Sequence, residues 1–132
     1  AACCSPDEDG QGGVALFPGE EALIGARGWA KVGELPGGGL LLTCDGACDR
    51  SRRPLGCMIF PLTPRFVRGE LRVRIDCRSR PMCPLAPGGV RALRPEFVAA
   101  VAEALRLIAS DPEGEAFLRA WEAVERQYRF RL

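Results

Sequence analysis

The clearest pattern of hydrophobic and polar positions lies in the last third of the chain and predicts a pair of helices. Residues 95–110 begin with Pro95 and Glu96, as helices often do, and then place four apolar side chains on one helical face: Phe97, Val101, Leu105 and Ile108. Residues 110–113, Ser-Asp-Pro-Glu, end this helix and cap a second one in capping-box form. The second helix carries an apolar stripe that we expect in the core: Phe117, Trp121, Val124 and Tyr128.

A period of two, typical of strands, dominates earlier in the chain. Residues 66–76 alternate apolar side chains with arginines, and Arg68-Gly69-Glu70 fits a tight turn, so we expect a hairpin with one solvated face. Further short strands are predicted at 12–17, 29–32 and 40–44, with a short helix after Pro18 and a glycine-rich turn at 36–39. Between these segments, three prolines argue against regular structure: Pro54, Pro61 and Pro64.

The length of 132 residues predicts a single domain of the α+β class. Glycine and proline number 16 and 11 and concentrate before residue 96, so that portion is expected to be rich in loops. We therefore predict a small metal-stapled domain over 1–132. Its cysteine-rich, metal-binding part spans 1–90, and a helical hairpin over 95–132 packs on it.

Charge is distributed unevenly along the chain, although the formal net charge is only +1. Residues 1–49 carry −6, residues 50–94 carry +9 with eleven arginines, and residues 95–132 carry −2. Arginine forms bidentate contacts with carboxylates and phosphates. The simplest interpretation is that the basic middle neutralises the acidic ends and any cluster of thiolates. Nucleic-acid binding is not expected, because few aromatic side chains interleave with the arginines.

Nothing in the sequence predicts a membrane span or a signal peptide. The chain has no run of eighteen apolar residues, and its first ten residues have neither a basic nor an apolar stretch. An odd number of cysteines cannot pair completely within one chain, and cytosolic thiols more often bind metals or act in catalysis. We expect a cytoplasmic protein without a membrane partner. A secreted disulfide protein is the alternative.

Cysteine chemistry is the main functional signal, because the chain has seven cysteines and no histidine. The absence of histidine excludes the usual Ser-His and Cys-His nucleophile arrangements. Thiolates select zinc, copper(I) or iron–sulfur clusters over harder ions. The cysteine spacing matches neither a zinc ribbon nor a bacterial ferredoxin. Nearby arginines would lower cysteine pKa values and offset thiolate charge. Cys77 ends a strand-like run and is the cysteine best interpreted as a small buried hydrophobe.

The segments TCDGACDRSRRPLGCMIFPL and RPMCPL, with the N-terminal cysteine pair, resemble the CxxCxxCC-type zinc- or iron-chelating proteins. That group includes flagellin lysine N-methylase-like proteins, and the resemblance spans residues 3–84. Its most specific part is Arg53-Pro54-Leu55-Gly56-Cys57 through Pro61. The resemblance implies a metal held by Cys4, Cys48, Cys57 and Cys83, with Cys3 and Cys44 as further candidate ligands.

We therefore expect a small protein that binds a metal ion, zinc first, through cysteine thiolates. A closed four-thiolate site would be structural, and the protein would then act as a module that binds a protein partner. An iron–sulfur protein with a redox or electron-transfer role is the main alternative, and a methyltransferase-related protein is a further one. The sequence leaves open whether the protein is an enzyme, and no catalytic residue is assigned.

Overall fold

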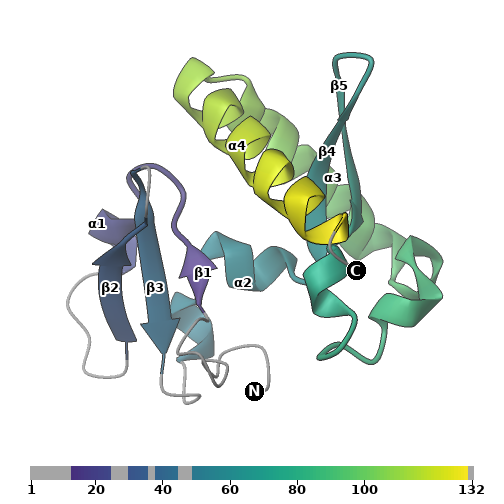
Figure 1. Ribbon diagram of the computed structural model, residues 1–132, viewed down its shortest axis with the longest axis horizontal. Coiled ribbons are helices and arrows are strands. Elements are labelled where there is room, and N and C mark those ends of the chain that lie inside the picture. The colour runs from purple at the N-terminus through teal and green to yellow at the C-terminus, as the bar shows by residue number, and fades with distance from the viewer. Residues whose placement is uncertain (1–12, 25–29, 36–37, 45–48, 131–132) are drawn as a thin grey trace. The chain divides into compact units, whose positions relative to one another are not determined.

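The computed structural model describes residues 13–24, 30–35, 38–44 and 49–130. Within these ranges it confirms the α+β class, with α-helices, two small antiparallel sheets and a C-terminal helical pair (Figure 1). The chain divides into two compact units, Ala1–Met58 and Ile59–Leu132. Among the described residues, no helix combines the length and the apolar character needed to span a membrane.

The first unit contains a three-stranded sheet in the order β1-β3-β2 (Figure 1). Strand β3 (Leu40–Cys44) pairs antiparallel with both β1 (Val14–Ala15) and β2 (Ala30–Glu34). A single turn of helix, α1 (Glu21–Ile24), lies between β1 and β2 in the sequence. The three strands confirm the short strands predicted within 12–17, 29–32 and 40–44, although β1 is shorter and β2 extends further than expected.

The core of this unit is small. Leu16, Ile24, Leu42 and Cys44 form its buried cluster, with Val14, Ala30 and Leu40 packed against it. Gly13 permits the close approach of the chain to β3. A Cβ atom at this position would lie 2.5 Å from the carbonyl oxygen of Leu42, and its φ of 126° suits only glycine.

The proline-rich stretch is more regular than expected. A 3-10 turn, η2 (Arg50–Arg52), leads to a short helix, α2 (Leu55–Ile59), directly after Pro54. Proline is tolerated immediately before a helix because the first helical turn leaves its N–H groups without intrahelical partners. Pro54 therefore marks the start of α2 and does not prevent regular structure in this stretch.

A two-stranded hairpin opens the second unit. Strand β4 (Leu62–Val67) pairs antiparallel with β5 (Glu70–Ile75), and the expected tight turn is confirmed at Arg68 and Gly69, with φ values of 51° and 83°. Two consecutive positive φ values are typical of the turns that match strand twist. Strand β4 begins earlier than expected and includes Pro64. A two-stranded sheet leaves one edge of β4 unpaired, where proline is tolerated.

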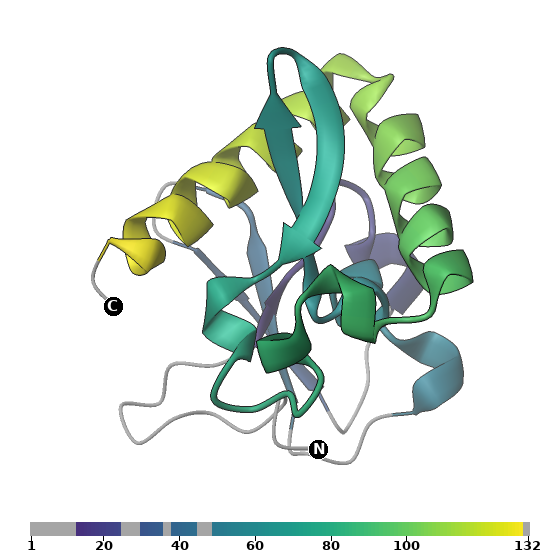
Figure 2. The same ribbon diagram turned by 90° about the vertical axis from the view of Figure 1, so that its right-hand side faces the viewer.

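Two long helices pack on this hairpin. Helix α3 (Pro95–Ala109) contacts β5 and β4, whereas α4 (Pro112–Arg129) contacts β4 and the 3-10 turn η3 (Cys77–Ser79). Figure 2 shows the hairpin flanked by the two helices. Two further 3-10 turns, η4 (Ala86–Gly88) and η5 (Val90–Ala92), precede α3. Buried apolar residues come from both strands, from η4 and from both helices: Leu62, Leu71, Ala86, Val101, Ala102, Leu105 and Leu118.

The expected face of α3 is confirmed, since Val101 and Leu105 are buried, but the expected face of α4 is wrong. Val124 and Tyr128 are 45% and 46% exposed. The buried positions of α4 lie one residue further along the sequence, at Leu118, Glu122 and Glu125. A step of one residue turns a helix by about 100°. Two glutamates therefore lie on the buried face of α4, where we had expected only apolar side chains.

The capping-box form implied that Ser110 caps the start of α4. The cap is instead Asp111. The carboxylate of Asp111 accepts hydrogen bonds from the backbone N–H groups of Glu113 and Gly114. The Ser110 hydroxyl instead donates to the carbonyl oxygen of Leu107. Proline at the first position of α4 costs nothing there, because its missing N–H would have no intrahelical partner.

Candidate functional site

The predicted metal ligands fall in both units and partly outside the described residues. Cys44 is buried in the core of the first unit, Cys57 is half-buried in α2, and Cys83 is half-buried after η3 in the second unit. The other three predicted ligands lie outside the described residues: Cys3, Cys4 and Cys48. The burial of Cys44 among apolar side chains is also the environment of a cysteine that acts only as a small hydrophobe.

A carboxylate fixes the helix that carries Cys57. Glu20 accepts hydrogen bonds from the backbone N–H of Phe17, at 2.9 Å, and from the backbone N–H of Leu55 at the first position of α2. The N–H of Cys57 in turn donates to the carbonyl oxygen of the buried Pro54. The segment around Phe17-Pro18 is thereby tied to the Arg53–Cys57 motif, 35 residues further along the chain. Cys57 thus sits on a positioned backbone and stays partly accessible.

A second group of metal-binding side-chain types lies in the other unit. The ligand atoms of Asp76, Cys77 and Glu125 lie within 4.8 Å of one another, and all three residues are buried. Asp76 and Cys77 come from the end of β5 and the start of η3, and Glu125 comes from the last turns of α4. The contact between η3 and α4 therefore assembles this group from residues about fifty positions apart.

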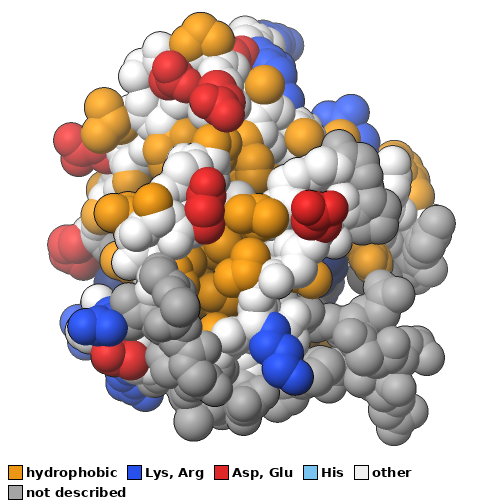
Figure 3. All heavy atoms as spheres, turned by 90° about the vertical axis from the view of Figure 1, so that its left-hand side faces the viewer, with side chains coloured by type: hydrophobic (Ala, Val, Ile, Leu, Met, Phe, Trp, Pro, Cys, Tyr) orange, Lys and Arg blue, Asp and Glu red, His pale blue; other side chains and the backbone are white. Residues whose placement is uncertain are grey.

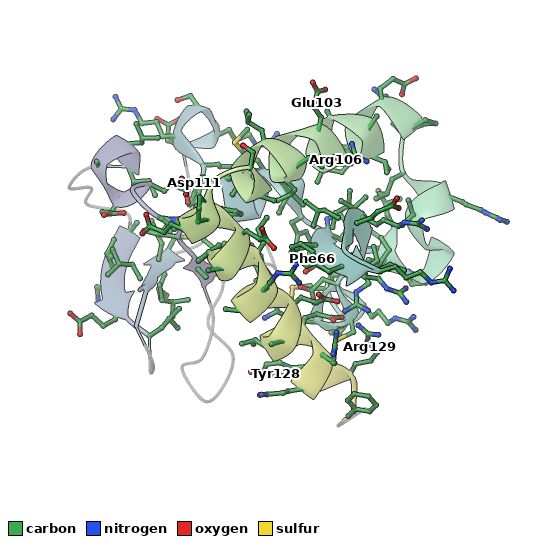
Figure 4. The ribbon with its side chains drawn as sticks, turned by 90° about the horizontal axis from the view of Figure 1, so that it is seen from above. Phe66, Glu103, Arg106, Asp111, Tyr128 and Arg129 are labelled. Carbon is green, nitrogen blue, oxygen red and sulfur yellow. The ribbon has the colours of Figure 1, made fainter. Side chains whose placement is uncertain are left out.

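Arginines already neutralise both carboxylates of this group. Asp76 accepts from Nε and Nη2 of Arg78 at 2.9 and 2.6 Å, in a bidentate arrangement. Glu125 accepts from Arg74 and, at 2.7 Å, from Nη2 of Arg129. Its other oxygen accepts the backbone N–H of Cys77 at 3.2 Å. Figure 4 shows Arg129 and Tyr128 near the end of α4.

The thiol of this group is held in its neutral form. Burial is the largest cause that raises the pKa of Cys77, and together with the hydrogen bond and negative charge of Glu125 it brings this pKa to about 11. The Sγ atom lies 3.7 Å from the backbone carbonyl oxygen of Glu125, which suits a protonated thiol as donor. A thiol ligates a metal as thiolate. Cys77 is therefore poorly suited to be a ligand.

The charge balance leads to the same result. Two carboxylates and three guanidinium groups surround the neutral thiol, so a divalent cation would enter a region that already has an excess of positive charge. This group is best described as an ion-pair network that fastens α4 to the hairpin. Figure 3 shows hydrophobic, acidic and basic side chains all exposed at the surface.

Comparison with known proteins gives no match: no family model, no curated protein and no solved structure matches the chain. The resemblance to CxxCxxCC-type proteins therefore rests on the cysteine motifs alone.

The ion-pair network was not predicted from the sequence, although a local signal for it exists. Glu122 and Glu125 are three residues apart on one face of α4, and each has an arginine four residues later. Both i,i+4 pairs form, Glu122 with Arg126 at 3.3 Å and Glu125 with Arg129 at 2.7 Å. The arginines that alternate along β5 include Arg74, which supplies the partner of Glu125 from the hairpin.

Proposed function

We propose that this protein binds a metal ion, zinc first, through cysteine thiolates of its first unit. The observation that carries the proposal is the distribution of the cysteines. Five of the seven fall between Ala1 and Met58, at positions 3, 4, 44, 48 and 57. The described core of the same unit consists of one small cluster. Units of about this size commonly need a disulfide or a metal to be stable.

The environment of Cys57 supports a role as a ligand. Its helix is anchored by Glu20 through Leu55, so the thiol is positioned by the fold. A half-buried thiol can be reached by an ion and is still partly shielded from solvent. Preorganisation of this kind lowers the entropic cost of assembling a coordination sphere.

Ligand chemistry restricts the metal to those that bind sulfur well, with zinc as our first choice. Without histidine, the nitrogen and mixed donor sets of many zinc, copper and iron sites are excluded, and sulfur donors dominate. Sulfur-rich sites hold zinc in closed tetrahedral geometry, which would give the first unit a structural staple. Cys83 belongs to the second unit, and its place in the ligand set is a separate prediction.

Metal analysis of matched cysteine variants tests the proposal. Full-length protein purified without oxygen should be colourless and contain about one zinc ion per chain. Cys57→Ser should lose most of this metal, whereas Cys77→Ser should keep it, because Cys77 is a neutral buried thiol. Cys83→Ser, measured in parallel, decides whether the second unit contributes a ligand. Equal retention of metal by the Cys57 and Cys77 variants would contradict the proposal. A brown protein that contains iron would show that the bound group is an iron–sulfur cluster and not zinc.

A second measurement locates the metal. Removal of zinc with a chelator should expose the first unit to proteolysis while the helical signal of α3 and α4 in circular dichroism persists. Loss of both together would instead show that the metal stabilises the second unit.

A further inference from the structure

An apolar groove runs along one face of α3 in the second unit. Small and apolar residues of α3 form its floor, Pro95, Val98, Ala99 and Ala102, and Arg106 lies at the end of this stripe one turn further on. Val73 of β5 also lines the groove, as do Val90, Arg91 and Leu93 before α3. The groove has a volume of about 610 Å³ and is open to solvent along its length. From Pro95 to Arg106 the stripe spans twelve residues of helix, or about 16 Å.

The shape of the floor suits a second helix. Positions 95, 98, 102 and 106 follow the i, i+3, i+7, i+11 spacing with which helices present a packing face. Ala99 and Ala102 are small, so the backbone of a packing partner can come close to α3. An amphipathic helix that lies in an apolar groove is a recurring mode of peptide recognition.

The charges at the rim indicate the sign of the partner. Arg72, Arg91 and Arg106 line the groove and are exposed. Within the described part of the chain, no carboxylate pairs with Arg91 or Arg106, and Arg72 is paired only with the exposed Glu70 at 3.1 Å. Glu103 projects from α3 away from the hairpin (Figure 4) and does not line the groove.

We propose that this groove binds an acidic amphipathic helix of a partner protein, with apolar side chains on the α3 stripe and carboxylates beside Arg91 and Arg106. Apolar contact would supply most of the affinity, and the arginines would select against neutral or basic segments. Planar guanidinium groups suit this role because they bind carboxylates in bidentate geometry.

Fluorescence anisotropy of the full-length protein with designed helical peptides tests this inference. The probe is a fluorescein-labelled peptide of about fourteen residues, with leucines on one face and glutamates beside them. A control peptide replaces the glutamates by glutamines. The acidic peptide should bind about tenfold more tightly than its control, and the difference should shrink as salt is raised.

Matched arginine variants assign the binding to the groove. Arg91→Gln combined with Arg106→Gln should weaken the acidic peptide about tenfold and leave the glutamine peptide unaffected. Arg80→Gln removes an exposed arginine of the same unit that does not line the groove, and should change neither. Ala99→Phe should block both peptides by filling the groove.

Three results would overturn the inference. They are failure of the acidic peptide to bind, equal binding of the two peptides, and equal loss of binding in the Arg80 variant and the groove variants. Folding of each variant is checked by circular dichroism, and the Arg80 variant serves as the reference for charge loss without loss of the site. If a single-stranded oligonucleotide competed with the peptide and this competition needed the same arginines, the partner would be a nucleic acid and not a protein helix.

Discussion

Glu125→Gln should destabilise the second unit by about 3 kcal/mol, although glutamine has nearly the same shape. Glu125 is 1% exposed and is the counter-ion of Arg74, whose side chain is only 14% exposed. Removal of one partner of a buried ion pair costs about 3–5 kcal/mol, because the remaining charge is left without compensation. The lower end of the range applies here, since glutamine still offers an oxygen to the N–H of Cys77 and Arg129 is 42% exposed to water.

The same helix supplies a matched control. Glu115 pairs with Arg119 at the same i,i+4 spacing and at 2.7 Å, but these side chains are 41% and 51% exposed. Exposed pairs contribute at most about 1 kcal/mol. Glu115→Gln should therefore change stability by less than that amount. Both variants remove a carboxylate that has an arginine four residues later, so the difference between them reports mainly the effect of burial.

Urea unfolding followed by tryptophan fluorescence is the assay. The chain has two tryptophans, and Trp29→Phe leaves Trp121 of α4 as the reporter of the second unit. The midpoint for Glu125→Gln should fall with an unchanged slope. Replacement of the pair by apolar residues, Arg74→Met with Glu125→Leu, should recover much of the loss. If Glu125→Gln were no more destabilising than Glu115→Gln, the buried network would not be what fastens α4 to the hairpin.

Two further changes test the packing of the second unit. Because the folded protein raises the pKa of Cys77 from 9.0 to about 11, it favours the neutral thiol, and this stabilisation is complete below pH 9 and lost as pH rises to 11. The stability of wild type relative to Cys77→Ser, measured by urea unfolding, should fall across that interval, and a constant difference would refute the assignment. Gly114→Ala should destabilise by about 1–3 kcal/mol despite the better helix propensity of alanine, because its Cβ would lie 2.2 Å from the carbonyl oxygen of Ile108; a rise in melting temperature would contradict this.

Local pattern predicted the elements whose stabilising contacts are themselves local. The face of α3 that carries Val101 and Leu105 could be found because apolar residues recur at the helical period. The hairpin turn at Arg68-Gly69 could be found because glycine readily adopts a positive φ at a tight turn. In both cases the residues that determine the conformation lie within a few positions of one another.

The buried face of α4 could not be predicted in this way. A hydrophobic pattern assigns glutamate to solvent, and Glu122 and Glu125 are buried only because partners from the hairpin satisfy them. The backbone N–H of Phe66 donates to Glu122 at 3.2 Å, and Arg74 reaches Glu125 from β5. Sequence periodicity has no information on which strand will face which helix. Charge pairs between elements about fifty residues apart therefore cannot be predicted from local sequence and become visible only in the tertiary structure.

The network also changes what the arginine-rich middle of the chain means for the cysteines. Proximity in sequence suggested that arginines beside Cys77 would lower its pKa and prepare a thiolate. The opposite holds in the fold, because Arg78 is bound to Asp76, and Arg74 is bound to Glu125. Arg78 still lowers the pKa of the thiol, but burial, Glu125 and Asp76 together outweigh it. An arginine next to a cysteine therefore does not produce a thiolate when the thiol is buried and carboxylates lie beside it. The pKa of Cys57 should therefore be measured with and without zinc. A low pKa only in the presence of zinc indicates that the metal stabilises the thiolate, whereas a low pKa in both states indicates that nearby arginines do so.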